Sequence, residues 1–117
     1  MDRKILQQRT KQFHIDVIKL CAQLPGNAAG FETAKQLIRA AGSVGANYRA
    51  SARAESKPDF INKIQIIIEE VDELQYWLEI IRETALLEGM ELNRLIIEAN
   101  ELTAIFTATN KTAKLKD

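Results

Sequence analysis

An unbroken apolar repeat in the second half of the chain constrains the fold more than any other feature. Hydrophobic side chains alternate at intervals of four and three residues, at Phe60, Ile64, Ile67, Val71, Leu74, Leu78, Ile81 and Ala85. This 3.5-residue spacing places them along one side of a helix, as in the seam of a bundle. Ser56, Pro58 and Asp59 favour a helix start just before the repeat. We predict a long helix over 57–87.

Three further segments carry apolar residues at helical spacing and are separated by short connections. They cover residues 5–24, 31–55 and 91–109, with Pro25-Gly26 and Gly89 as breaks between segments. Residues 110–117 are predicted to be a basic tail. No strand pattern competes with these helices, and short loops between long helices favour antiparallel neighbours. The sequence therefore predicts a single all-α domain over 1–117, an up-down-up-down four-helix bundle.

Two glycines in the second segment, Gly42 and Gly45, have the G-x-x-G spacing of some phosphate-gripping loops. A Walker A loop would need lysine and then Ser or Thr after the second glycine, which is not present. A loop of the kind that clamps RNA in KH domains matches the short pattern, but helical periodicity continues through both glycines. A glycine inside a helix costs roughly 1 kcal/mol relative to alanine. We therefore expect these glycines to permit close packing of another helix.

A polar stripe lies on another side of the same segment. Arg39, Ser43 and Asn47 recur at intervals of four residues, one helical turn apart. The 57–87 helix carries Glu70 and Glu73, which share a face. Two interpretations of these polar groups remain open. They are exposed to solvent, or the stripe contacts the carboxylates. A metal site at Glu70 and Glu73 is a weaker hypothesis, because carboxylate di-iron centres also use Glu-x-x-His motifs and the only histidine is His14.

The 57–87 helix has more apolar residues than one seam requires. The surplus residues are Ile61, Ile66, Ile68, Trp77 and Ile80. A helix that is apolar on more than one side needs a further partner. Self-association is the interpretation we favour over an unusually wide core in a monomer.

Charge is balanced overall, with 16 Lys and Arg against 16 Asp and Glu, so no strongly basic domain marks a nucleic-acid-binding protein. The two chain ends meet at one end of such a bundle, where basic residues can gather into a modest phosphate-binding patch. Its candidates are Arg3, Lys4, Arg9, Lys11, Lys111 and Lys114. The single cysteine, Cys21, lies on an apolar face and is predicted to be buried and inert. We find no catalytic set and predict no enzymatic activity, no cofactor, no metal and no membrane span, and a cytoplasmic location.

The most specific motifs are "GANYR" (45–49), "AES" (54–56), "DFINK" (59–63) and "YWLE" (76–79). Together they resemble the four-helix bundle protein family, also called the S23 or 23S rRNA-intervening sequence protein family. The resemblance covers nearly the whole chain. It implies a left-handed up-and-down bundle that assembles as a homopentamer without catalytic activity. Some members are encoded within intervening sequences of bacterial 23S rRNA genes, and a basic retroelement relative associates with nucleic acid.

The polar positions characteristic of the family match Arg39, Ser43, Asn47, Glu70 and Glu73. Two further family positions, usually Glu and Arg, are occupied here by Ala50 and Ala52. We therefore expect a scaffold or a module that binds another protein, assembled from copies of itself. RNA or DNA binding, linked to 23S rRNA intervening sequences or to a retroelement-like accessory role, is the alternative.

Overall fold

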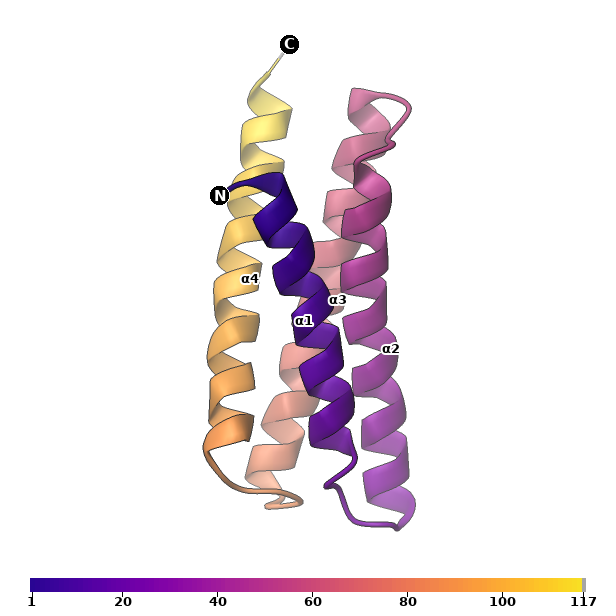
Figure 1. Ribbon diagram of the computed structural model, residues 1–117, viewed down its shortest axis with the longest axis vertical. Coiled ribbons are helices and arrows are strands. Elements are labelled where there is room, and N and C mark those ends of the chain that lie inside the picture. The colour runs from indigo at the N-terminus through magenta and orange to yellow at the C-terminus, as the bar shows by residue number, and fades with distance from the viewer. Residues whose placement is uncertain (117) are drawn as a thin grey trace.

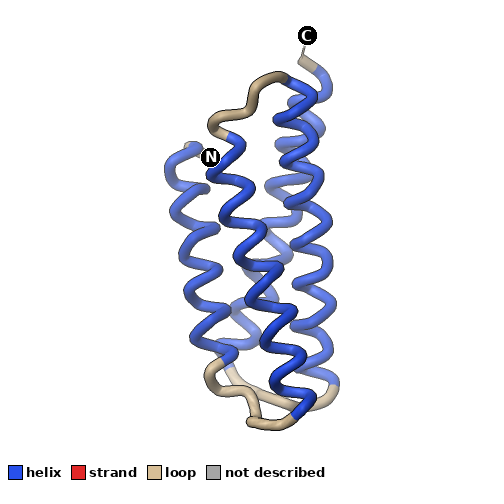
Figure 2. The backbone as a smooth tube through the Cα atoms, turned by 90° about the vertical axis from the view of Figure 1, so that its right-hand side faces the viewer, coloured by secondary structure: helices blue, strands red, loops and turns tan. Residues whose placement is uncertain are grey.

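The computed structural model describes residues 1–116, which form four helices and no strand. The helices are α1 (Arg3–Cys21), α2 (Ala28–Ser51), α3 (Lys57–Glu83) and α4 (Met90–Leu115). They alternate in direction along a rod of 49 × 21 × 21 Å, and α1 begins and α4 ends at the end that carries the α2–α3 connection (Figure 1, Figure 2). The predicted all-α four-helix bundle is confirmed.

The core follows the predicted seam. Six of the eight repeat positions are 0 % exposed, namely Ile64, Ile67, Val71, Leu74, Leu78 and Ile81. They meet the apolar rows of the other helices in a single cluster that includes Val17, Leu37, Leu95 and Phe106. The start of α3 also follows the prediction, because the Ser56 side chain accepts a hydrogen bond from the Asp59 backbone N–H at 3.1 Å.

The end of α3 differs from the prediction, which extended the helix to residue 87. The helix ends at Glu83, and Ala85 has a φ of 55°, in the left-handed region. The Leu86 N–H donates to the Ile81 carbonyl at 3.1 Å and the Ala85 N–H donates to the Arg82 carbonyl at 3.2 Å. These two bonds form a Schellman cap. Periodicity alone placed Ala85 on the seam, because the spacing of apolar residues carries no information about a cap.

The predicted basic tail over 110–117 is wrong for its first part, because α4 continues to Leu115. Asn110 is only 3 % exposed, and its side-chain N–H donates to the Gln65 side-chain carbonyl at 3.3 Å. The long α3 supports this extension of α4. Asp117, the last residue of the predicted tail, lies outside the described residues.

The remaining helix ends shift by a few residues because of local capping. Asp2 caps α1 and Asn27 caps α2, so both helices begin before their predicted starts at residues 5 and 31. After Cys21 and after Ser51 the backbone continues in i to i+3 turns. These turns replace the last residues of the predicted segments 5–24 and 31–55.

Candidate functional site on the α2 and α3 face

Arg39 on α2 joins two carboxylates of α3. Its guanidinium donates to Glu70 at 2.9 Å and to Glu73 at 2.5 Å. The Arg39 side chain is 49 % exposed, whereas Glu70 is 15 % exposed and Glu73 is 35 % exposed. The hydrogen bond from Arg39 is the main cause that lowers the pKa of Glu73, and the same carboxylates raise the pKa of Arg39. Of the two interpretations of the polar stripe, contact with the carboxylates is the one observed at Arg39.

The other two members of the stripe bond to each other within α2. The Asn47 side-chain N–H donates to the Ser43 backbone carbonyl at 2.9 Å and to the Ser43 hydroxyl at 3.0 Å. Both residues are partly buried. They therefore make no direct bond to Glu70 or Glu73, although they lie one and two turns further along the same side of the helix.

The five surplus apolar residues of α3 divide between two edges of the helix. Ile66, Trp77 and Ile80 follow the spacing of Glu70 and Glu73, at intervals of four, three, four and three residues, and so lie on the edge next to α2. Ile61 and Ile68 share the opposite edge with Gln65 and Gln75, whose side chains bond to Asn110 and Asn100 of α4. All five are partly buried, and Ile68 and Trp77 pack against the core.

We call the edge next to α2 the α2–α3 face. It comprises Arg39, Ser43 and Asn47 from α2 and Ile66, Glu70, Glu73, Trp77 and Ile80 from α3. Tyr76, which is 55 % exposed, lies beside it with its ring perpendicular to that of Trp77. Half-buried isoleucine and tryptophan around a central arginine–carboxylate cluster are typical of protein–protein interfaces, in which aromatic residues and arginine are enriched.

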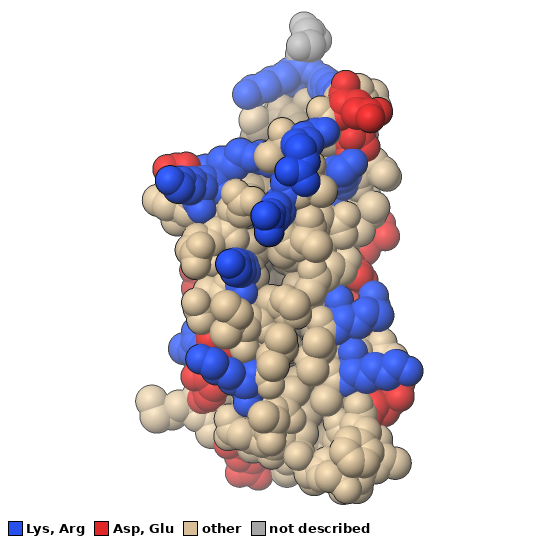
Figure 3. All heavy atoms as spheres, turned by 45° about the vertical axis from the view of Figure 1, so that its right-hand side comes forward, with Lys and Arg blue, Asp and Glu red and all other residues tan. Residues whose placement is uncertain are grey.

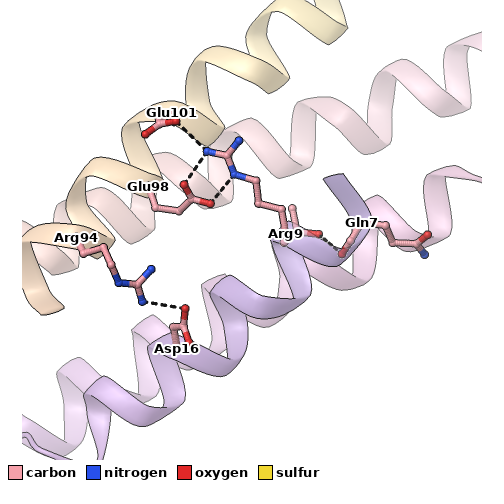
Figure 4. Close-up of polar contacts among 7 residues, drawn as sticks. Gln7, Arg9, Asp16, Arg94, Glu98 and Glu101 are labelled. Atoms are coloured by element: carbon pink, nitrogen blue, oxygen red, sulfur yellow. Dashed lines mark hydrogen bonds and ion pairs between the residues drawn. The ribbon is translucent and has the colours of Figure 1, made fainter. Parts of the chain in front are cut away.

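The predicted basic patch is distributed over four places. Arg9 points from α1 to α4, where it holds Glu98 by two bonds of 2.6 and 2.7 Å and also contacts Glu101 (Figure 4). Arg3 donates to the Ser51 hydroxyl at 2.7 Å. Lys111 and Lys114 lie in the last turns of α4.

Ion pairs bridge the seam between α1 and α4, where the backbones approach less closely than in the other neighbouring pairs. Besides the Arg9 cluster, Arg94 of α4 donates to Asp16 of α1 at 2.9 Å (Figure 4). Burial by itself favours the protonated form of Asp16, but hydrogen bonds from Arg94 and Gln12 lower its pKa overall. These side chains therefore stabilise the least closely packed seam of the bundle.

Lys4 and Lys11 lie elsewhere, in a groove between α1 and α2 that also contains Arg49 and Arg53. The two arginines are absent from the predicted patch. The sequence does carry a signal for them, because Gly42, Gly45 and Arg49 are spaced by three and four residues and therefore share one side of α2. Arg53 continues this spacing in the turn that follows the helix. Which neighbour that side faces could be known only from the packing.

No cluster of metal-binding side chains accompanies these sites within residues 1–116, where no three His, Cys, Asp or Glu residues are grouped to hold an ion. Cys21 is 9 % exposed, and burial raises the pKa of its thiol to about 11. This agrees with the prediction of a buried, inert thiol. Over the same residues, no helix is both long and apolar enough to cross a membrane.

The four helices define an up-and-down helical bundle. The chain belongs to the family described as 23S rRNA-intervening sequence protein, which matches residues 3–108. It is similar to a crystal structure described as a protein with unknown function from the S23 ribosomal protein family of Bacteroides thetaiotaomicron VPI-5482. The two share 27 % identity with a TM-score of 0.85, over 95 % of this chain and 99 % of that one. No protein of curated function matches the chain. The resemblance predicted from the sequence motifs is confirmed.

Proposed function

We propose that the protein is a non-enzymatic scaffold that assembles from copies of itself through the α2–α3 face. The observation that carries this proposal is the position of Ile66 and Ile80. Both are partly buried, yet neither packs against the hydrophobic core. They lie at the two ends of the row that contains Glu70, Glu73 and Trp77. Burial of the exposed parts of these side chains by a second copy supplies a favourable hydrophobic term.

The Arg39 cluster sets the orientation in which a second copy can bind to this face. Glu70 and Glu73 are held by one guanidinium, and the partly exposed guanidinium retains donors that can reach a carbonyl or carboxylate of a neighbouring copy. Charged groups of this kind contribute specificity and register more than affinity. We therefore assign Arg39 to the alignment of the copies and the apolar residues to the association energy.

The family resemblance supplies the number of copies, which is five. A pentamer of the 13.2 kDa chain has a mass of about 66 kDa. Light scattering after gel filtration at micromolar concentration is expected to give this mass. A mass of 13 kDa under these conditions would show that the proposal is wrong.

The Ile66→Gln/Ile80→Gln variant tests the location of the interface. Each change removes apolar contact at a position outside the core, so we expect the helical circular dichroism to persist while the assembly dissociates. About 1.4 kcal/mol lost per position corresponds to a tenfold weakening for each change. The matched control is Ile97→Gln on α4, where the side chain is 58 % exposed and lies outside the α2–α3 face. If the Ile66→Gln/Ile80→Gln variant keeps the mass of the assembly, as the Ile97→Gln control should, the interface lies elsewhere.

A further inference from the structure

Four cationic side chains converge on one groove between α1 and α2. Lys4 and Lys11 come from α1, Arg49 comes from α2, and Arg53 lies in the turn that follows α2. The groove has a volume of about 570 Å³, and no acidic residue lines it. Figure 3 shows Lys and Arg side chains gathered along the upper part of this side of the molecule. We call this feature the α1–α2 groove.

Small residues form the wall of the groove on α2. Gly42, Gly45, Ala46 and Ala50 contribute little side chain there. A Cβ atom added to Gly42 would lie 3.2 Å from the His14 ring, so the glycine leaves room for that ring beside α2. The wall lacks any large apolar or aromatic residue. The α2 wall therefore offers no anchor for the apolar face of a peptide helix.

The four cations form no ion pair with any of residues 1–116. This distinguishes them from Arg9, Arg39 and Arg94, each of which binds two carboxylates. In a chain with zero net charge, a groove with four unpaired cations and no carboxylate concentrates positive potential at one place. An anion is the ligand that such a groove attracts.

The length of the groove indicates which anion it fits. Lys4 and His14 are ten residues apart on α1, which corresponds to about 15 Å along the helix axis. A nucleic-acid strand carries one phosphate per roughly 3.4 Å of duplex axis, so about four phosphates span this length. We propose that the α1–α2 groove binds the phosphodiester backbone of a nucleic-acid strand, one phosphate for each of the four cations. Because contacts to phosphates carry no sequence information, this binding is independent of base sequence.

The test measures binding of a fluorescein-labelled 12-base-pair DNA duplex by anisotropy. Neutralising four phosphates of a duplex gives a slope of about −3.6 for log affinity against log salt, and therefore a loss of about 150-fold between 50 and 200 mM salt. Lys11→Gln/Arg49→Gln is expected to halve the slope. The matched control, Lys111→Gln/Lys114→Gln, makes the same change in net charge at the end of α4 and is expected to leave the slope unchanged.

Ala46→Glu provides a second test at an exposed position of the groove. Glutamate is a good helix former, so the helical circular dichroism should persist, whereas the added carboxylate repels phosphate and binding should be lost. The absence of binding by the unmodified protein at 50 mM salt, or equal weakening by the groove and α4 variants, would overturn the proposal. Equally effective displacement by poly-glutamate would overturn the assignment to a phosphodiester backbone.

The groove and the α2–α3 face lie on different sides of α2, so the two proposals fail separately. Arg49 and Gly45 face α1, whereas Arg39 contacts α3. Light scattering on the Lys11→Gln/Arg49→Gln variant should therefore give the same mass as the unmodified protein. A loss of the assembly together with binding would show that the groove is part of the subunit interface instead.

Discussion

Ala85 occupies a backbone position that glycine adopts with less strain. Its φ of 55° is in the left-handed region, at the residue that follows the α3 C-cap. An L-residue with a side chain loses roughly 1 kcal/mol or more there. Ala85→Gly is therefore expected to raise the free energy of unfolding by up to about 1 kcal/mol, measured by urea denaturation. Ala52→Gly is the matched control, because Ala52 has an ordinary φ of −64° and glycine should lower stability there. A loss of stability in both variants would contradict the strain argument.

Gly30 and Gly45 of α2 differ in how closely other atoms approach them. A Cβ atom at Gly30 would lie 1.9 Å from the Pro25 carbonyl oxygen, so the α1–α2 connection can pass over the first turn of α2 only because residue 30 has no side chain. A Cβ atom at Gly45 would lie 3.6 Å from the Thr10 carbonyl oxygen, an ordinary contact. Gly42 and Gly45 do face another helix, as predicted, but close approach does not require glycine at position 45.

Substitutions at these two positions should have opposite effects on stability. Gly30→Ala forces the backbone at Pro25 to move and is expected to lower the free energy of unfolding by about 1–3 kcal/mol. Gly45→Ala is expected to raise it by up to about 1 kcal/mol, because alanine has the higher helix propensity. Urea denaturation of both variants measures the difference. A change of the same sign in both would show that the surroundings of the two glycines do not determine the outcome.

For the whole molecule, carboxylates that connect different helices make stability depend on pH. Hydrogen bonds from arginine lower the pKa of Glu73, which connects α3 to α2, and of Asp16, which connects α1 to α4. A carboxylate with a lowered folded-state pKa stabilises the fold above its unfolded pKa of about 4, and this stability is lost as the pH falls through the folded-state pKa. We expect constant stability near neutral pH and a decline below about pH 4.5.

The comparison is made by urea denaturation at pH 7 and pH 3. Each pair is partly exposed to solvent, so its contribution should not exceed about 1 kcal/mol. The Asp16→Asn/Glu73→Gln variant should be less stable than the unmodified protein at pH 7 and lose less stability at pH 3. An identical pH dependence in the two proteins would show that other carboxylates are responsible.

The sequence by itself determined the helices, the seam and the family. Apolar residues at intervals of three and four specify which side of each helix is buried, and Ser56 specifies where α3 begins. Only the tertiary structure decided which neighbouring helix the other sides of each helix face. It directs Arg39 toward α3, Arg9 toward α4 and Arg49 toward α1. The physical reason is that periodicity records the position of a residue around its own helix, whereas a groove or an ion pair depends on which helix packs beside it.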